Sequence, residues 1–347
     1  MGHDLASSTE QSLCEELAKT GHSVTLISPG QLNPVGYYHH EIKDVRLPGL
    51  TSITGSMAAL KLVKKMNLDK FDLVLVDWRY IFSHFQKRDF QNRPWMIIDR
   101  GPPTHRGFLN GLQKKQWKRA WTIASEEAVG GFVVSRKHAD FVEGVANVNV
   151  PLFALPAGSK PNPNKLDKPD MSDILILSYV GQLDERRDVK SIIALSEGLS
   201  KENIMHRIDV CGSGDSQSLF EDSSKSMDGI SFHGIVSNDR MFKLLSESHV
   251  GIMPMPDIPV WRISSTLKLA NYLASGLIII GPKHPGNGSM ITGDWNFLQK
   301  QDWIEKSVFL LSDMVKNHQE FSGTSRLGDL SWGIIAQSMV EVIEKIT

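Results

Sequence analysis

The stretch that decides the fold is residues 174–189, which read ILILSYVGQLDERRDV. Residues 174–180 form an almost continuous apolar run, which is typical of a strand buried on both faces of a sheet. Gly181 follows at once, then a polar turn that ends in Arg186 and Arg187, and a helix is predicted after it. A strand, a glycine turn and a helix in this order are the unit from which parallel α/β sheets are built.

The same alternation extends in both directions from this stretch. Further strands are predicted downstream at residues 206–210, 230–232, 250–253 and 277–280, and upstream at 22–28, 71–76, 95–98 and 131–134. Helices are predicted between them, including a long one at 108–127 and an amphipathic last one at 330–346. The pattern predicts an α/β protein of two doubly wound Rossmann-like domains.

Five of the 16 prolines fall between residues 151 and 169, where the alternation breaks. Such a stretch is unsuited to helix or strand and favours an interdomain linker. We therefore expect domains at 1–157 and 171–329, with a linker at 158–170. Because ligands of doubly wound sheets bind beyond the carboxyl ends of the strands, the two domains are expected to face a cleft.

The composition excludes several classes of protein. The chain has 347 residues, 41% apolar and 22% charged, and a formal net charge of -1, so we expect no nucleic-acid partner. Its two cysteines, Cys14 and Cys211, make neither a disulfide framework nor a zinc site and fit a reducing compartment. No apolar stretch reaches the roughly 20 residues that span a bilayer. We expect a cytoplasmic protein, with peripheral contact at the inner face of a membrane left open.

Residues 259–276, PVWRISSTLKLANYLASG, are the most informative about chemistry. The Ser-Ser-Thr start and the final glycine predict a helix whose first amides are free. Such a helix end, with Arg262 and Lys268 beside it, suits a diphosphate. The alternative is an ordinary capped helix with Lys268 on a solvated face.

Three other strand ends hold candidate residues. Gly181 and Arg187 either approach a phosphate or form a surface turn. Gly212 lies in the run CGSGDS, which lacks the third glycine of a dinucleotide fingerprint and favours a tight turn over NAD binding. Asp99 and Arg100, with His105 beyond them, either point into the cleft or form an ion pair that holds a loop. No metal-ligand spacing and no Asp-x-Asp pair occurs, so no metal site is expected.

Five blocks in register resemble the family-4-type retaining glycosyltransferases of the GT-B fold, and the resemblance covers nearly the whole chain. The blocks are residues 17–25, 179–187, 208–214, 232–236 and 267–276. The resemblance implies a final helix, within 330–347, that returns to the first domain. It also implies metal-independent, cofactor-free transfer of a sugar, with retention, from a nucleoside diphosphate sugar to a hydroxyl of a glycan or lipid-linked acceptor.

The resemblance assigns roles to two sets of residues. The catalytic set is Asp99, Arg100, His105, Arg187 and Lys268. The donor-binding set is Gly181, Gln182, Gly212, His233, Gly234, Ile235, Arg262, Ser265, Thr266, Leu267 and Asn271. By this resemblance, the amides at 265–267 with Arg187 and Lys268 stabilise the departing diphosphate. Asn271 binds the ribose, and residues 233–235 cradle the base. The first-domain residues of the catalytic set face the donor sugar or the acceptor.

The sequence also departs from the family's pattern. The strand and glycine-rich loop that precede the first helix in the family are absent or reduced to residues 1–5, so either the start site is truncated or the first sheet lacks a central strand. Asn271 stands where the family has a glutamate, Gln182 where it has an arginine, and Asp99–Arg100 where it has a histidine. These departures leave open a non-catalytic nucleotide-sugar binder or scaffold, and a GT-B-fold sugar-nucleotide epimerase is a third hypothesis.

Overall fold

The computed structural model describes residues 5–43, 51–82, 87–103, 108–166, 168–288, 296–319 and 323–346. The chain divides into two compact units. Unit 1 comprises Met1–Ala157 and Trp332–Thr347, and unit 2 comprises Gly158–Ser331. The chain therefore leaves unit 1 after residue 157 and re-enters it at residue 332.

Unit 2 contains a six-stranded parallel sheet with the order β12-β11-β10-β7-β8-β9. Its strands are β7 (Leu175–Val180), β8 (His206–Cys211), β9 (Ile230–Gly234), β10 (Val250–Ile252), β11 (Ile278–Pro282) and β12 (Asn296–Gln299). Its helices are α5 (Ser191–Lys201), α6 (Gln217–Ser226), α7 (Asn238–Glu247), α8 (Pro259–Arg262), α9 (Leu267–Ala274), α10 (Pro285–Gly288) and α11 (Trp303–Lys316), with short 3-10 turns η4 (Glu185–Arg187) and η5 (Gly328–Leu330). The strand order reverses between β7 and β10, which is where a doubly wound sheet opens to ligands.

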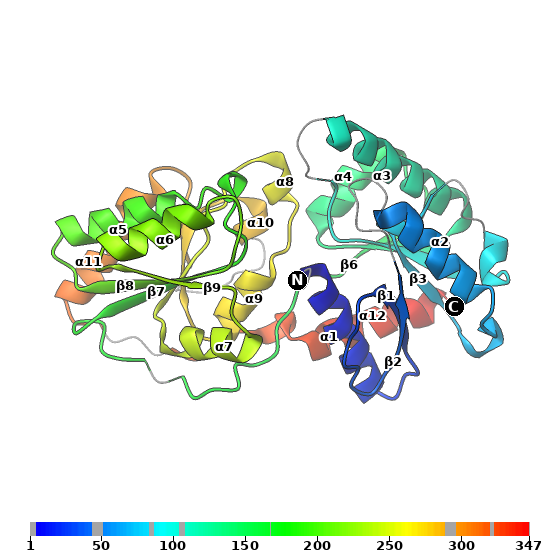
Figure 1. Cartoon of the computed structure of the whole chain (residues 1–347), viewed down its shortest axis with the longest axis horizontal. Helices are drawn as coiled ribbons and strands as arrows, with labels where there is room; N and C mark the ends of the chain where they lie inside the picture. Colours follow the sequence, from blue (N-terminus) through cyan, green and yellow to red (C-terminus); the bar gives the residue numbers. More distant parts are fainter. Residues whose placement is uncertain are drawn as a thin grey trace. The chain divides into compact units, whose positions relative to one another are not determined.

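Helices cover both faces of this sheet. One core cluster joins the sheet to α5, α6 and α11 and contains Leu195 and Phe220. A second cluster joins α7 and α9 to the sheet and contains Leu245 and Leu269. In Figure 1, α5 and α6 lie on one side of β7, β8 and β9, and α7 and α9 lie on the other. Burial on both faces explains why β7 reads as a continuous apolar run.

Unit 1 contains two separate parallel sheets. In one, β1 (Thr25–Pro29) pairs with β2 (Tyr38–Ile42), and the other has the order β3 (Val74–Asp77), β4 (Trp95–Asp99), β5 (Gly130–Val133), β6 (Leu152–Ala154). No strand within the described ranges pairs with both β1 and β3. Every residue of β1 and β3 is partly exposed, whereas β4 and β5 are buried throughout.

The helices of unit 1 surround these sheets. They are α1 (Leu5–Lys19), α2 (Thr51–Val63), α3 (Phe108–Glu127), α4 (Arg136–Ala146) and α12 (Trp332–Ile346), with 3-10 turns η1 (Leu68–Lys70), η2 (Trp78–Tyr80) and η3 (Lys87–Phe90). The last helix, α12, packs against α1, as Figure 1 shows for the red and dark blue helices. Its buried face includes Ile335, Ala336 and Met339, so the amphipathic stripe at the end of the chain covers the first helix.

The predicted elements agree with the structure where the apolar pattern is strong. The helix at 108–127 has the predicted bounds, and the predicted strands are present within about three residues at their ends. Three strands, β2, β6 and β12, and the helices α4, α10 and α11 were not predicted. β2 consists mainly of polar, exposed residues, and β6 lies inside the proline-rich stretch, so neither carries a clear apolar signal.

The segment 158–170, which we expected to be a linker, belongs to unit 2 and is hydrogen-bonded to the rest of it. The amide of Ser159 donates to the carbonyl of Leu330 at 2.9 Å. The side chain of Asn162 donates to the Phe242 carbonyl and the Ser275 hydroxyl at 3.0 and 2.9 Å. Lys168 donates to carbonyls at the ends of α7 and α9. The segment lacks helix and strand because of its prolines, yet its polar side chains bind the open carbonyls of two helix ends.

Candidate functional site

The carboxyl ends of β7 and β8 meet through two glycines. Gly181 and Gly212 have φ values of 146° and 139°, a region that L side chains rarely adopt. A Cβ on Gly212 would overlap the carbonyl oxygen of Gly181, so the two turns nest only because Gly212 lacks a side chain. A Cβ on Gly181 would lie 3.1 Å from Nζ of Lys268. The missing side chain of Gly181 therefore leaves room for Lys268 against the end of β7.

Lys268 lies in the first turn of α9 and is buried, with 7% of its surface exposed. Its Nζ lies 4.1 Å from the ring centroid of Tyr179 and has no hydrogen-bond partner in the described part of the chain. Burial lowers the pKa of Lys268 well below its usual range, Arg187 lowers it further, and Asp184 opposes the shift. A buried amine without an anionic partner is costly, so this position suits a ligand that supplies the anion.

Arg187 is held beside this amine by four neighbours. Its Nε donates to Oδ2 of Asp184 at 2.9 Å, and its Nη2 donates to Oε1 of Gln182 at 3.0 Å. Its Nη1 lies 3.6 Å from the sulfur of Met255, and its guanidinium lies 4.8 Å from the ring centroid of Trp261. These contacts hold the guanidinium in one orientation, which is how arginine binds phosphate with the least loss of entropy.

The start of α9 and the start of η4 each add a polar atom without a hydrogen-bond partner among the described residues. The Oγ1 of Thr266 and the Oδ1 of Asp184 are buried without a hydrogen bond to any described residue. Thr266 is the residue before the helix, and its side chain does not cap it. The first amides of a helix, including that of Leu267, have no intrahelical carbonyl to bind. Ser265 directly precedes Thr266, so the predicted 265–267 turn begins the helix that carries Lys268.

Arg262, by contrast, pairs outward with Asp257. Its Nε and Nη2 donate to the two oxygens of that carboxylate at 2.7 and 3.2 Å. The two side chains are 56% and 44% exposed. The guanidinium is already neutralised at the surface, which makes it a weaker candidate than Lys268 for binding a phosphate.

The residues predicted to cradle the base lie at the end of β9. His233 Nε2 lies 2.7 Å from Oδ1 of Asp209, a buried carboxylate that also accepts from Arg207. Gly234 has a φ of 64° and accepts a hydrogen bond from the Gly212 amide. Ile235 is 74% exposed. The three residues thus adjoin the β8 turn, and their contact with a base stays a prediction.

Asn271, predicted to bind a ribose, lies one turn after Lys268 in α9 and contacts the segment that was expected to be a linker. The hydroxyl of Ser159 lies 2.8 Å from the Oδ1 position of its amide, and the Nδ2 position lies 3.7 Å from the sulfur of Met241. The side chain is half-buried.

Asp99 is fully buried among structural partners, which argues against the prediction that it faces the donor sugar or the acceptor. Its Oδ2 accepts from Nε1 of Trp117 at 2.6 Å and from Nε1 of Trp121 at 2.9 Å, and its Oδ1 accepts from the Gly101 amide at 2.8 Å. Buried indole N–H groups need acceptors, and this carboxylate supplies one for both. Its function is to hold α3 against the end of β4.

Arg100 also makes structural contacts. Its Nε donates to Oε1 of Glu10 at 3.1 Å and its Nη1 donates to the Leu155 carbonyl at 2.8 Å. Burial raises the pKa of Glu10, and the charge of Arg100 opposes that shift. The pair joins α1 to the ends of β4 and β6. His105 lies outside the described residues, so its role stays a prediction.

The sequence reasoning missed three contributors to the cluster around Lys268. Tyr179, Asp184 and Trp261 were quoted only as parts of longer segments. Tyr179 lies under the amine, Asp184 binds Arg187, and Trp261 stacks on it. The Asp184–Arg187 spacing is the one signal that pointed to a pair, since residues three apart face each other in a turn of helix.

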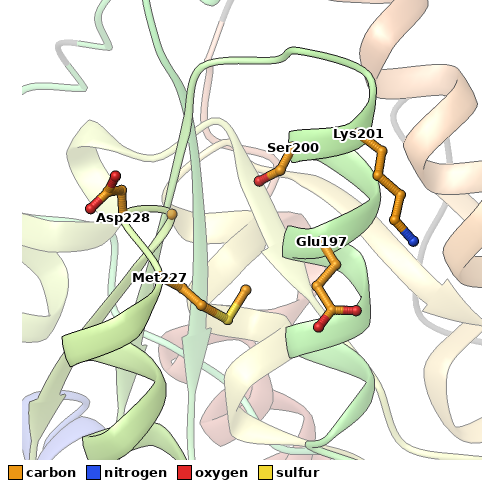
Figure 2. Close-up of a pocket in the computed structure, with 6 residues that line it drawn as sticks. Glu197, Ser200, Lys201, Met227 and Asp228 are labelled. Carbon is orange, nitrogen blue, oxygen red and sulfur yellow. The ribbon is translucent and has the colours of Figure 1, made fainter.

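The hollow in Figure 2 lies elsewhere on unit 2. It is lined by Glu197, Ser200 and Lys201 of α5 and by 227–229, the segment before β9. It therefore lies toward the amino ends of the strands, at the edge opposite Gly181 and Lys268. Among the described residues, no three His, Cys, Asp or Glu side chains are placed to hold a metal ion, and no helix is long and apolar enough to cross a membrane.

Neither the family models nor the curated proteins contain a match to this sequence. Solved structures do resemble it. Sucrose-phosphate synthase from Thermosynechococcus elongatus is 15% identical with a TM-score of 0.73, over 99% of this chain and 93% of that one. WaaG, a glycosyltransferase involved in lipopolysaccharide biosynthesis, is 13% identical with a TM-score of 0.65, over 99% and 97%.

A third similar structure is Anabaena Alr3699/HepE in complex with UDP-glucose. It is 12% identical with a TM-score of 0.59, over 89% of this chain and 86% of that one. At such identities a structural likeness establishes the fold and leaves the activity open. The chain has the GT-B fold, with its two α/β units built on parallel sheets.

Proposed function

We propose that the protein is a glycosyltransferase that moves a sugar from a nucleoside diphosphate sugar to an acceptor hydroxyl. The observation that carries the proposal is the buried amine of Lys268, which has no hydrogen-bond partner within the described ranges and lies beside the fixed guanidinium of Arg187. Both lie where the strand order of the unit 2 sheet reverses, the usual ligand position in doubly wound sheets. The similar HepE structure contains UDP-glucose, which supports the same class of donor.

The chemical step requires stabilisation of negative charge. As the bond between the anomeric carbon and the diphosphate breaks, charge grows on the departing oxygens and the sugar becomes oxocarbenium-like. Lys268, Arg187 and the amides at the start of α9 bind that charge. One preorganised donor at such a position is worth about 3 kcal/mol, so two cations supply a large part of the rate.

Retention and metal independence belong to the same proposal. The resemblance of the five sequence blocks supports retention, and NMR of the anomeric configuration of the product tests it. Metal independence is supported by the two cations and the helix amides, which supply the charge that a divalent ion supplies elsewhere. We expect activity to persist in EDTA, and dependence on added Mg²⁺ or Mn²⁺ would contradict this part.

The experiment that tests the transfer measures release of nucleoside diphosphate from a panel of UDP-, GDP- and ADP-sugars with glycan and lipid extracts as acceptors. The wild-type protein is expected to turn over at least one donor. Lys268→Met should reduce that rate about 100-fold, the effect typical of losing one transition-state donor. Lys201→Met removes an exposed lysine of α5 and serves as the matched control. A full panel without turnover would refute the proposal.

The acceptor is proposed to be a glycan or a lipid-linked molecule presented at the inner face of a membrane. Helix α3 carries four exposed cations, at Lys114, Lys115, Lys118 and Arg119, and Leu112 beside them is 49% exposed. Exposed cations of this kind are attracted to anionic lipid. Sedimentation with liposomes tests the contact, and equal partitioning onto neutral and acidic vesicles would exclude it.

A catalytically impaired nucleotide-sugar binder is the second candidate. It is favoured by Gln182, whose side chain binds Arg187 where the family has a second arginine, and by the burial of Asp99. Calorimetric binding of a nucleoside diphosphate without turnover of any donor in the panel would support this candidate over the transferase.

A further inference from the structure

Ser159 is buried at the point where the chain enters unit 2. It is 2% exposed, its amide donates to the Leu330 carbonyl at 2.9 Å, and it forms a parallel bridge with Ser331. Its hydroxyl lies 2.8 Å from the carbonyl oxygen of Lys160 and 2.8 Å from the Oδ1 position of Asn271. The backbone contacts fix the position of Ser159, so its hydroxyl has little freedom to choose other partners.

The Ser159 hydroxyl cannot donate to both of its neighbouring carbonyl oxygens at once. A serine hydroxyl carries one proton, and here two carbonyl oxygens lie within bonding distance of it. The oxygen and nitrogen of an asparagine amide have nearly the same shape, and their assignment follows from the hydrogen-bond network. Turning the Asn271 amide by 180° lets its Nδ2 donate to the Ser159 oxygen while Ser159 donates to Lys160. Both contacts are then satisfied.

This orientation changes what Asn271 offers to a ligand. After the turn, its Oδ1 lies about where Nδ2 lay, next to the sulfur of Met241, which cannot donate a proton. The carbonyl oxygen of Asn271 is then free to accept a hydrogen bond. Asn271 and Lys268 are three residues apart in α9 and share one side of the helix, so a molecule whose diphosphate reaches Lys268 brings its adjoining sugar toward Asn271.

We propose that Ser159 is a positioning residue that presents the Asn271 carbonyl oxygen as an acceptor for a ribose hydroxyl of the donor nucleotide. The inference rests on the proposed function and deepens it, because it states that the protein accepts and the ligand donates at this point of the site. The ligand must donate a hydrogen bond at this point, so the site selects a ribonucleotide over its deoxy analogue. Without the Ser159 hydroxyl, the Asn271 amide can turn and presents either its NH2 group or its carbonyl oxygen to the ligand.

The test is a calorimetric comparison of nucleotides. UDP, GDP and ADP are titrated first, and the tightest binder is then compared with its 2′-deoxy and 3′-deoxy forms. For the wild-type protein, loss of the contacted hydroxyl is expected to weaken binding about 5- to 10-fold, the range for one neutral hydrogen bond. Ser159→Ala should reduce that deoxy penalty to less than about twofold. Ser159→Thr, which keeps the hydroxyl, and Ser200→Ala, an exposed control on α5, should retain the full penalty.

A rescue variant separates positioning from a general structural role. In Asn271→Asp both side-chain oxygens accept, so no partner is needed to choose the polarity. The double variant Ser159→Ala/Asn271→Asp is therefore expected to recover the deoxy penalty that Ser159→Ala alone loses. A merely structural effect of Ser159→Ala would weaken the ribo and deoxy forms equally and would not be rescued.

The outcomes distinguish this inference from the proposed function. Binding of a nucleoside diphosphate with no penalty for either deoxy form in the wild-type protein would overturn the inference and leave the proposed function intact, whether or not the Ser159 variants fold. An undiminished penalty in Ser159→Ala would overturn it as well. No binding of any of the three nucleotides would overturn both.

Discussion

The carboxyl edges of the two units pair their acidic and basic side chains to different degrees. In unit 1, Asp99 accepts from two tryptophans and an amide, and Arg100 binds Glu10 and a carbonyl, although its Nη2 is buried without a hydrogen-bond partner among the described residues. In unit 2, the buried amine of Lys268 and the buried hydroxyl of Thr266 have no hydrogen-bond partner in the described structure. Polar groups that satisfy one another hold a fold together, whereas buried groups that lack partners indicate where a ligand completes the structure.

The largest effect is expected at Asp99, at the carboxyl edge of unit 1. Asp99→Ala would leave the Nε1 atoms of Trp117 and Trp121 buried without an acceptor, which should lower the free energy of unfolding of unit 1 by about 3–5 kcal/mol. Urea denaturation followed by tryptophan fluorescence measures this, because both indoles contact the altered site. Asp99→Asn, which keeps one acceptor oxygen, should lose less.

The control for this prediction is Asp72→Ala, at an exposed position, which should change the free energy of unfolding by less than about 0.5 kcal/mol. If Asp99→Ala removed enzymatic turnover and left stability unchanged, Asp99 would belong to the site after all, and the contrast between the two units would fail.

The sequence predicted elements where burial follows a simple period and failed where it does not. Strands buried along all or nearly all of their length, such as β4 and β7, and the long helix α3 were recognised from their apolar residues. The role of Asp99 was not, because its partners lie 18 and 22 residues away on α3. A charged residue at a strand end has the same appearance in the sequence whether it faces a cleft or an indole ring.

Unit 2 also contains a buried titratable side chain, His249, whose two ring nitrogens are both hydrogen-bonded. His249 precedes β10 at the amino edge, where its Nδ1 accepts from the Ile176 amide at 3.0 Å and its Nε2 donates to the Pro169 carbonyl at 2.8 Å. Burial lowers its pKa to about 4, and Lys168 adds to this shift while Asp170 opposes it. The folded protein thus keeps this ring neutral where the unfolded chain takes up a proton.

The stability that His249 contributes is therefore present above its unfolded pKa near 6.5 and is lost as the pH falls toward 4. The loss should reach about 3 kcal/mol at the acid end of that window. His249→Gln can make both hydrogen bonds without titrating. Urea denaturation at pH 7, 5 and 4 should show a steeper loss for the wild-type protein than for this variant, and parallel curves would contradict the prediction.

Removing the buried amine of Lys268 should weaken ligand binding and raise the stability of the unliganded protein. Lys268→Met removes a buried amine and keeps its bulk, so unfolding without ligand should require more denaturant. The same change should weaken binding of a nucleoside diphosphate by about 2–3 kcal/mol, the value of hydrogen bonds to a charged group. Calorimetry and urea denaturation of one preparation measure both effects. Destabilisation together with unchanged affinity would mean that Lys268 is a core residue.

Because the pKa of Lys268 is lowered, ligand binding should be accompanied by measurable uptake of a proton. Because burial and Arg187 disfavour the charged amine and a diphosphate favours it, binding should raise its pKa and take up a proton between the lowered value and the usual value of about 10.4. Titrations at pH 8 in two buffers of different ionisation enthalpy measure this uptake. It should vanish in Lys268→Met, and affinity should fall as the pH rises through the window.

Part of this site was predictable from the sequence. The Ser-Ser-Thr turn before α9 indicated a helix start, and that pattern placed Lys268 in the first turn. The two features that make Lys268 a strong candidate were not predictable. Its burial depends on Tyr179, and its proximity to the β7 turn depends on Gly181, where a Cβ would lie 3.1 Å from its Nζ. Contacts between distant segments follow from the fold and have no local pattern.

The smallest effect is expected at Arg262, which the sequence placed beside the diphosphate and the structure pairs with Asp257 at the surface. Exposed ion pairs contribute about 0–1 kcal/mol, so Arg262→Ala should change the free energy of unfolding by less than about 0.5 kcal/mol. Its effect on nucleotide affinity should be under threefold and should shrink in 0.5 M salt, because only long-range charge is removed. Calorimetry at low and high salt, with Lys268→Met in parallel, checks both. A loss as large as that of Lys268→Met would mean that Arg262 leaves Asp257 to bind the ligand, and the difference between paired and unpaired cations would no longer identify the site.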